Sequence, residues 1–346
     1  MARAMGIPAI VTAGDRGGAK AVNGQNKVFL EVAGESLVAR VVATLQRVPE
    51  VSEIWVVGDA ARLRSVLDAS ALSDGLSKPL RLVEQFRDLY QNAWETYRRS
   101  LPGAPADGRD PVGDDLDFAV LYVSADLPFA TPHEISQFIQ RSQQRGCDYA
   151  AGLVTEASMA GFAPAVAGDP GIEMACFNLR EGRFRQSNLH YVKPGRLGNR
   201  HYIEDMYEHR HQRELGQILG LAWTLLVSET GGLGVLYYYG LMHVAGLADR
   251  RGWRRLADWI RRFIPTARIE KGCSGLLDTD FAFVVTDIGG CAVDIDNEHD
   301  YQIACQHFEQ WYADQLRLGE SRHPSLAAES RRRAGAAKGS GGSEAA

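Results

Sequence analysis

Small and basic residues follow the first apolar run of the chain. Residues 9–14 read Ala-Ile-Val-Thr-Ala-Gly, residues 15–20 form a glycine-rich basic loop, and Lys27 precedes the next apolar segment. Backbone N–H groups of a loop after a strand, joined by cationic side chains, hold the phosphates of a nucleotide. The pattern therefore predicts a triphosphate site, although the loop alone is also consistent with a simple turn. The predicted phosphate-contacting residues are Ala13, Gly14, Arg16, Gly17, Gly18 and Lys20.

Acidic residues follow two later apolar runs. Asp126 comes just after residues 118–123, and Asp294 and Asp296 follow residues 281–285. Ligands of open α/β sheets bind at the carboxyl ends of the strands, so Asp126 and the first loop are expected to lie close together. Mg²⁺ in nucleotide sites is bound through one or two carboxylates plus phosphate oxygens and water. Asp126 and Asp296 are predicted as these carboxylates, and capping of the following helix is the alternative role for Asp126.

Strands and helices alternate through the first half of the chain. Residues 34–48 carry apolar side chains at helical spacing, with Ser36 as the expected cap. This alternation predicts an α/β fold with a doubly wound, mostly parallel sheet of Rossmann-like type. The predicted strands are 8–13, 53–58, 81–83, 118–123, 149–154 and 281–285; the other predicted helices are 60–67, 90–99 and 300–316, with a further one opening at Pro132.

The second half of the chain is less regular. Residues 176–280 are predicted to form a substrate-side helical insertion. Within it, the apolar stretch 219–247 is interrupted by polar and glycine residues, so it predicts two short buried helices and a turn rather than a membrane span. The arginine- and tryptophan-rich stretch 253–262 predicts a packed amphipathic helix. Residues 321–346 are dominated by Ala, Gly and Ser, which is typical of a disordered tail.

Composition limits the classes of partner. The chain has 346 residues, of which 45% are hydrophobic and 23% charged, with five scattered cysteines and a formal net charge of −5. This charge does not favour nucleic acid as a partner. The dispersed cysteines and the lack of a signal-like apolar start favour a reduced, cytoplasmic protein. Contact with a membrane is not expected, and of its two forms peripheral binding is favoured over a membrane-spanning segment. The apolar part of residues 176–280 is compatible with a role in the core or in a homodimer.

Four motifs resemble, in the same order, those of the GT-A-type nucleotidyltransferases, the superfamily of the molybdenum-cofactor guanylyltransferases and the sugar-phosphate nucleotidyltransferases. The first two are Val11-Thr-Ala-Gly14 followed by Lys20, and Asn26-Lys27-Val-Phe-Leu30 followed by Val32-Ala-Gly34-Glu-Ser-Leu37. The others are Ser124-Ala-Asp126-Leu-Pro128 and Asp294-Ile-Asp296-Asn-Glu-His-Asp300. The resemblance covers residues 8–155 and 281–316. Lys20 stands where these enzymes have arginine, Asn26 where they usually have proline, and the loop is longer.

The resemblance implies a single nucleotidyltransferase domain over residues 1–320. Residues 8–155 would bind the nucleotide, 176–280 would face the acceptor, and 281–316 would supply the closing strand and helix. The implied reaction is Mg²⁺-dependent transfer of a nucleoside monophosphate from an NTP to a phosphorylated sugar, alditol or cofactor, with release of pyrophosphate. Lys27 would neutralise the attacking phosphate, while Lys20 or Arg16 would hold the leaving pyrophosphate.

Further roles also come from the resemblance. It implies that Gln85, Asn92 and Ala125 contact the nucleotide and that Asn188 positions the acceptor. For Arg210, contact with an acceptor phosphate is weighed against a charged, solvent-exposed helix face. Asp294 and Asp296 are two apart on a predicted strand end, which places both on one face; the resemblance favours Asp296 as the metal ligand.

Two other functions stay open at this point. The changes at Lys20 and Asn26 are compatible with a catalytically weakened nucleotide-binding or regulatory protein on the same fold. A GT-A glycosyltransferase is also compatible, although Asp126 lacks the paired acid that such an enzyme would need. A dinucleotide-dependent oxidoreductase is excluded because the first loop does not read G-x-G-x-x-G and no ribose-binding acid follows about 20 residues later.

Overall fold

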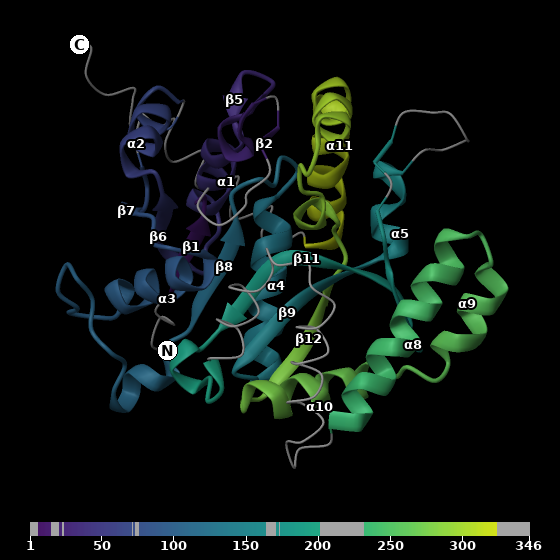
Figure 1. The fold of residues 1–346 in the computed structure, drawn as a ribbon. Helices are drawn as coiled ribbons and strands as arrows, with labels where there is room; N and C mark the ends of the chain where they lie inside the picture. The colour runs from purple at the N-terminus through teal and green to yellow at the C-terminus, as the bar shows by residue number, and fades with distance from the viewer. Residues whose placement is uncertain are drawn as a thin grey trace, which may run out of the picture.

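A mixed β-sheet runs through the centre of the molecule (Figure 1). The computed structural model describes residues 6–14, 21–22, 24–70, 72, 76–163, 171–172, 174–200 and 232–323. Several residues that the sequence predicts in the site lie outside these ranges, namely Arg16, Gly17, Gly18, Lys20 and Arg210. Residues 219–231 of the apolar stretch and the predicted tail from residue 324 onwards also lie outside them.

The strand order of the sheet is β12-β9-β11-β8-β1-β6-β7, and β10 pairs with β11. β1 is parallel to both β6 and β8, β6 is parallel to β7, and β12 is parallel to β9. β11 is antiparallel to β8, β9 and β10. The predicted doubly wound, mostly parallel sheet is therefore confirmed, with β11 inserted against the common direction. The strands are β1 Ile7–Thr12, β6 Val51–Gly58, β7 Leu80–Glu84, β8 Val120–Ser124, β9 Tyr149–Thr155, β10 Phe177–Leu179, β11 Gly182–Val192 and β12 Phe281–Thr286.

Helices cover both faces of the sheet. On one face, Val38 of α1, Leu63 of α2 and Phe138 of α4 pack in one core cluster with the strands. On the other face, Tyr97 of α3 and Ile260 of α9 pack in two further clusters. The helices are α1 Leu37–Gln46, α2 Ala60–Asp68, α3 Leu89–Ser100, α4 Pro132–Arg145, α5 Glu156–Met159, α8 Gly232–Arg250, α9 Arg254–Arg261, α10 Thr266–Leu277 and α11 Glu298–Arg322.

Element boundaries agree with the expectations where local signals are strong. Ser36 caps α1 as predicted, and its hydroxyl accepts a hydrogen bond from the N–H of Ala39 at 3.3 Å. This bond satisfies one of the free N–H groups of the first turn. The last helix differs, because α11 continues to Arg322 rather than ending at residue 316. The predicted tail from residue 321 therefore starts within a helix.

The prediction of short buried helices within 219–247 is wrong for the part that the structure describes. In place of a short helix near its end, α8 is a 19-residue helix, and it exposes Tyr237 and Val244. The predicted packed amphipathic helix within 253–262 is confirmed, because α9 buries Ala257 and Ile260, although Trp259 is 57% exposed. Apolar composition does not by itself distinguish a side chain that faces the core from one that faces solvent. No helix in the described part of the chain is long and apolar enough to span a membrane.

A fully buried carboxyl joins α4 to the segment after β12. Glu134, in the first turn of α4, accepts a hydrogen bond from the N–H of Cys291 at 2.8 Å. The hydroxyl of Thr286 lies 3.4 Å from the other carboxyl oxygen. Burial is the largest influence on this group and raises the pKa of Glu134 to about 8, although the hydrogen bonds act in the opposite direction.

The same junction is tightened by a close approach of two backbones. A Cβ atom on Gly290 would lie 2.0 Å from the carbonyl oxygen of Phe129, so only glycine fits there. Gly290 begins the 3₁₀ turn Gly290–Ala292. The turn leads directly into residues 293–296, which contain Asp294 and Asp296 and are called the acidic segment below. Glu134 and Gly290 together fix the position at which that segment enters the site.

Substitution of Gly290 tests this close approach. In Gly290→Ala the new methyl group would displace the backbone of Phe129, and we expect the free energy of unfolding to fall by about 2 kcal/mol or more. Gly161→Ala is the matched control, because a Cβ there has no neighbour within 4 Å. Urea denaturation of the two variants checks the prediction. Equal stability of the two would contradict it, because the backbone around Phe129 would then accommodate the methyl group without cost.

The buried carboxyl predicts a pH dependence of stability. Between pH ~4.5 and ~8 the unfolded chain has lost the Glu134 proton while the folded chain keeps it, so folding is weakened as the pH rises. Glu134→Gln removes this titration and keeps an acceptor for Cys291. We expect the variant to gain about 2 kcal/mol on the wild type between pH 5.5 and 7.5. Denaturation at pH 5.5 and at pH 7.5 measures this gain in stability, and Glu298→Gln, at an exposed glutamate, is the control. The same change in stability with pH in Glu134→Gln and in the wild type would contradict the raised pKa of Glu134.

Candidate active site

A capped 3₁₀ turn presents the first cationic side chain of the site. Lys27 opens the turn Lys27–Phe29, and the side chain of Asn26 accepts a hydrogen bond from the N–H of Val28 at 3.2 Å. The amide nitrogen of Asn26 donates to the carbonyl of Ala13 at 3.4 Å. Asn26, which stands where related sequences usually have proline, thus caps the turn and ties it to the end of β1.

The ammonium group of Lys27 lies between two of the predicted carboxylates. Its Nζ is 2.5 Å from Oδ2 of Asp126 and 3.0 Å from Oδ1 of Asp296. The Asp126 side chain is only 5% exposed, whereas that of Asp296 is 61% exposed. Residues separated by most of the chain therefore converge around one cation, with the buried acid on the inside and the other towards solvent.

Asp126 is positioned by the end of β8. The hydroxyl of Ser124 donates to Oδ1 of Asp126, and the N–H of Ala125 donates to the carbonyl of Thr12 at 3.2 Å. The carbonyl of Asp126 in turn accepts from the N–H of Ile295 at 3.4 Å. Capping is not the role of Asp126, because Thr131 is the N-cap of α4. The carboxylate is thus free of helix-capping duty and faces Lys27.

Asp294 and Asp296 do not lie on a strand end, which corrects the expectation from sequence. They follow the turn Gly290–Ala292 in an irregular segment that makes no ladder bonds. The alternation of side chains nevertheless persists, because Val293 and Ile295 are buried in the core while Asp296 is exposed. Burial of the two apolar residues, rather than strand pairing, orients the acids.

A second cation accompanies Asp294. Arg185 in β11 lies 3.0 Å from Oδ1 of Asp294, and its Nε donates to the carbonyl of Ala292 at 2.7 Å. Asp294 is only 18% exposed at its side chain, so it is a partly buried, paired acid rather than a surface residue. Arg185 and Glu134 were not predicted from sequence, since each acts through a contact between distant segments that no local motif marks. Ser124 lies in the motif that contains Asp126, but the sequence did not assign it a role.

The charges of the cluster shift the protonation of its members. Burial, followed by repulsion from Asp296 and Asp126, raises the pKa of Asp294 above its usual value. Partial burial tends to raise the pKa of Asp296, but the charge and hydrogen bond of Lys27 hold this pKa below its usual value. Burial tends to lower the pKa of Lys27, yet the two carboxylates raise it above its usual value. Three carboxylates thus face two cations, which leaves the cluster with an excess of negative charge.

The cluster fits a divalent cation that binds together with phosphate. Among the described residues, no group of three or more His, Cys, Asp or Glu side chains is arranged to hold a metal alone. Asp126 and Asp296 do contact the same ammonium group, so their oxygens already flank a positive charge. Mg²⁺ uses one or two carboxylates where phosphate oxygens and water complete its shell. The donor set therefore suits Mg²⁺ carried with a nucleotide better than an all-protein metal site.

Two side-chain amides face the backbone at the end of β1. A Cβ atom on Gly14 would lie 2.6 Å from Nδ2 of Asn92 and 3.2 Å from Oε1 of Gln85. Both amides belong to buried residues, and Oδ1 of Asn92 accepts from the N–H of Phe86 at 2.6 Å. The structure thus brings together Gly14, Gln85 and Asn92, three residues that the sequence analysis placed in the nucleotide site. The absence of a side chain at Gly14 is what allows the two amides to pack against its backbone.

Asn188 makes a hydrogen bond neither to the amides beside Gly14 nor to the carboxylates around Lys27. Its Nδ2 atom donates to the carbonyl of Cys291 at 3.5 Å. The residue lies inside β11, where the pairing register with β9 shifts between Gln186 and His190. Asn188 therefore contacts the turn that precedes the acidic segment, and its role toward an acceptor stays a prediction.

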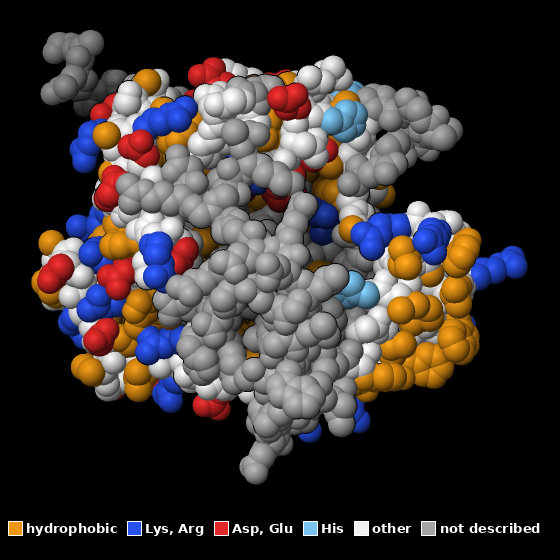
Figure 2. All heavy atoms as spheres, viewed as in Figure 1, with side chains coloured by type: hydrophobic (Ala, Val, Ile, Leu, Met, Phe, Trp, Pro, Cys, Tyr) orange, Lys and Arg blue, Asp and Glu red, His pale blue; other side chains and the backbone are white. Residues whose placement is uncertain are grey.

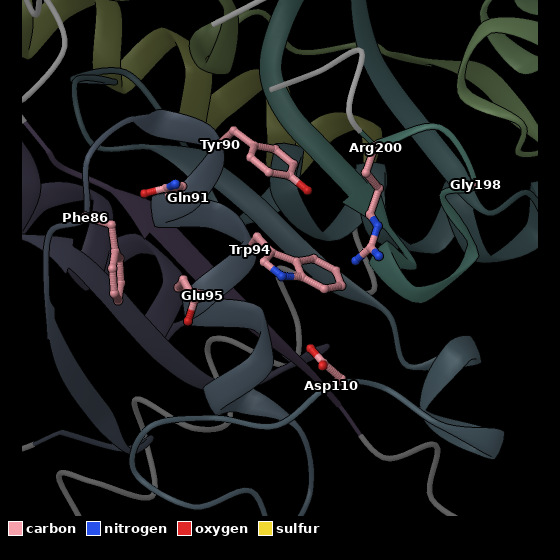
Figure 3. Close-up of a pocket in the computed structure, with 8 residues that line it drawn as sticks. All are labelled: Phe86, Tyr90, Gln91, Trp94, Glu95, Asp110, Gly198 and Arg200. Atoms are coloured by element: carbon pink, nitrogen blue, oxygen red, sulfur yellow. The ribbon is translucent and has the colours of Figure 1, made fainter. Parts of the chain in front are cut away.

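A surface hollow lies on the outer side of α3. It has a volume of about 600 Å³, and Figure 3 shows the guanidinium of Arg200 directed toward the ring of Trp94, 3.9 Å from its centroid. The lining residues are Phe86, Tyr90, Gln91, Trp94, Glu95, Asp110, Gly198 and Arg200. None of them is a residue that the sequence predicts in the site, and none belongs to the cluster of Lys27, Arg185 and the three aspartates. We therefore place the candidate site at the strand ends and not in this hollow.

Comparison with known proteins bears on the family and the fold of this chain. The MobA-like NTP transferase domain matches residues 9–219. A hypothetical transferase from Thermus thermophilus is similar in structure, with a TM-score of 0.50 and 18% identity over 86% of this chain and 99% of that chain. That likeness shows the fold alone. No curated protein matches the sequence.

Two further solved structures have lower scores. One is 4-diphosphocytidyl-2C-methyl-D-erythritol synthase from Anaerococcus prevotii, with a TM-score of 0.44 and 14% identity. The other is CMP:2-keto-3-deoxy-manno-octonic acid synthetase complexed with CTP, with a TM-score of 0.45 and 11% identity. Each similarity covers 88% of this chain and 99% of the other, and neither bears on which substrate this chain uses. The match over residues 9–219 spans more than half of the chain and includes Lys27 and Asp126; the chain belongs to the MobA-like NTP transferase family.

Proposed function

We propose that this protein is a Mg²⁺-dependent nucleotidyltransferase. It transfers a nucleoside monophosphate from an NTP to a phosphorylated small molecule, such as a sugar, alditol or cofactor phosphate, and releases pyrophosphate. The observation that supports this most is the convergence of Lys27, Asp126 and Asp296 beside the end of β1. Family membership supports the general class of reaction.

The reaction brings two anions together. An oxygen of the acceptor phosphate forms a bond to the α-phosphorus of the NTP, and the bond from that phosphorus to the bridging oxygen breaks, so pyrophosphate leaves with its electron pair. The enzyme must align the groups in line and supply positive charge. Mg²⁺, when bound, would supply charge to the phosphate oxygens next to Asp126 and Asp296. Neither oxidation nor reduction takes place.

Each described residue of the cluster has a role in this proposal. Lys27 neutralises the incoming phosphate, since its ammonium group is held at the strand ends by acids and is largely withdrawn from solvent. Asp126, fixed by Ser124, is the inner carboxylate toward the metal, and Asp296 is the outer one. Asp294 and Arg185 are positioning residues, because their ion pair holds the acidic segment without contact to Lys27.

The nucleoside would lie across the end of β1 from Lys27, Asp126 and Asp296. Gly14 has no side chain, so the amides of Gln85 and Asn92 pack against its backbone, and these amides would contact the edge of the base. Arg16 or Lys20 would hold the leaving pyrophosphate, as the sequence predicts, and Asn188 and Arg210 would face the acceptor. We propose that these parts form one domain over residues 1–320, with residues 176–280 as its acceptor-side insertion.

Loss of the inner carboxylate tests the proposed chemistry. The full chain, given Mg²⁺, each of the four NTPs and a panel of sugar and alditol phosphates, should release pyrophosphate with at least one pair. Asp126→Asn should reduce this rate at least about 100-fold, because it removes charge stabilisation where the phosphates react. Asp107→Asn, an exposed acid in the α3–β8 connection, is the control. Nucleotide binding without pyrophosphate release from any pair would instead favour a regulatory protein.

The proposed base contact has a separate test. Asn92→Ala removes an amide that faces Gly14, and we expect the nucleotide-induced rise in melting temperature to shrink, with the preference among the four NTPs weakened about tenfold in Kd. Gln91→Ala on the same helix is the control, because Gln91 lines the hollow outside α3. Unchanged affinity and preference in Asn92→Ala would remove this residue from the nucleotide site.

A further inference from the structure

An exposed apolar face covers α8 and α9. Of the eleven large hydrophobic side chains that are exposed in the described part of the chain, seven fall between residues 237 and 263. Figure 2 shows a hydrophobic area over this helix pair, with basic side chains at its edges. We name this area the α8–α9 face; its members are Tyr237, Val244, Leu247, Trp253, Leu256, Trp259 and Phe263. Proteins rarely expose such a contiguous patch without a partner for it.

The apolar side of α9 is wider than the part that packs on the core. Ala257 and Ile260 are buried and, together with Ile264 after the helix, pack against the body of the protein. Leu256 and Trp259 lie three positions apart and continue this apolar side toward solvent, 41% and 57% exposed. Phe263, in the turn after the helix and 48% exposed, packs its ring against that of Trp259, with the centroids 5.3 Å apart. A helix that only covers a core needs no apolar residues beyond the buried part, so this outer part is available for contact with something else.

The charges around this face are strongly one-sided. Residues 232–268 contain seven arginines and two aspartates, although the whole chain has a net charge of −5. Both aspartates lie against Arg183 of β11, at 3.5 Å for Asp249 and 3.1 Å for Asp258, so their charge is compensated within the fold. The arginines without an ion pair to any described residue are Arg250, Arg251, Arg255, Arg262 and Arg268.

The charge pattern distinguishes two occupants of the face. In a two-fold dimer through this face, each copy would present the same arginines to the other, and no unpaired acid of the face would compensate them. A surface of anionic lipid headgroups would pair with the arginines. Trp and Phe side chains are suited to the boundary between headgroups and acyl chains, and arginine stems pack there while the guanidinium groups stay in contact with phosphate.

We propose that the α8–α9 face docks on the surface of an anionic membrane. The two helices lie along the membrane plane, with Trp259, Phe263 and Leu256 entering the headgroup boundary and Arg255 and Arg262 contacting lipid phosphates. The docking is peripheral and reversible, and it depends on both the apolar and the charged side chains. This proposal does not depend on the nucleotidyltransferase reaction.

Vesicle flotation with the full chain tests the proposal. The protein should float with vesicles of phosphatidylglycerol and phosphatidylcholine, should bind pure phosphatidylcholine far more weakly, and should be released by 0.5 M NaCl, which screens the attraction. The double variant Arg255→Gln/Arg262→Gln should bind about 25-fold more weakly, from roughly fivefold per basic residue. Trp259→Ser/Phe263→Ser should lose flotation even at low salt.

Two controls keep the result interpretable. Val112→Ser removes an exposed apolar side chain elsewhere, 68% exposed, and should bind like the wild type. Melting curves of all variants should coincide, because the changed side chains are exposed. Absence of flotation with anionic vesicles would overturn the proposal. So would a dimer of the wild type in sedimentation experiments that Trp259→Ser/Phe263→Ser dissociates, since this would assign the face to a second copy.

Discussion

The contact on which the rest of the site depends is the ammonium of Lys27 held between the carboxylates of Asp126 and Asp296. A buried carboxylate without a counter-charge is costly, so the largely buried Asp126 requires a cation at this point. Three separate parts of the chain have to meet for the contact to form. They are the turn after the first loop, the end of β8 and the irregular segment after β12, and the packing of the sheet determines where each arrives.

Supporting residues explain how that contact stays in place. Asn26 caps the turn that carries Lys27, Ser124 holds one oxygen of Asp126, and Arg185 pairs with Asp294 beside Asp296. Glu134 and Gly290 secure the acidic segment from behind, through a buried hydrogen bond and a close backbone approach. Among the residues of the site that the structure describes, three acids share two cations, and this negative excess favours a further cation. A site of this kind suits phosphate chemistry, in which the metal arrives with the substrate.

The sequence predicted the parts of the fold that local patterns encode. The strands, the cap at Ser36 and the shared edge at which β1 and β8 end follow from apolar runs, capping chemistry and the geometry of parallel sheets. It did not predict Glu134 or Arg185, because a buried glutamate and a strand arginine have no local mark and their partners lie far along the chain. It also placed Asp294 and Asp296 on a strand, although alternating burial orients them without one. The exposed part of the apolar side of α9 was missed, since periodicity shows that a side is apolar, not how much of it meets the core.

The central claim is that Lys27, Asp126 and Asp296 surround the position of the reacting phosphates and their metal. Crystals of the protein grown with Mn²⁺ and a non-hydrolysable NTP analogue allow the ion to be located directly by anomalous scattering. The account predicts a single strong peak within coordination distance of carboxylate oxygens of both Asp126 and Asp296, with the triphosphate beside Lys27. A nucleotide bound elsewhere, or a peak that neither carboxylate approaches, would contradict it.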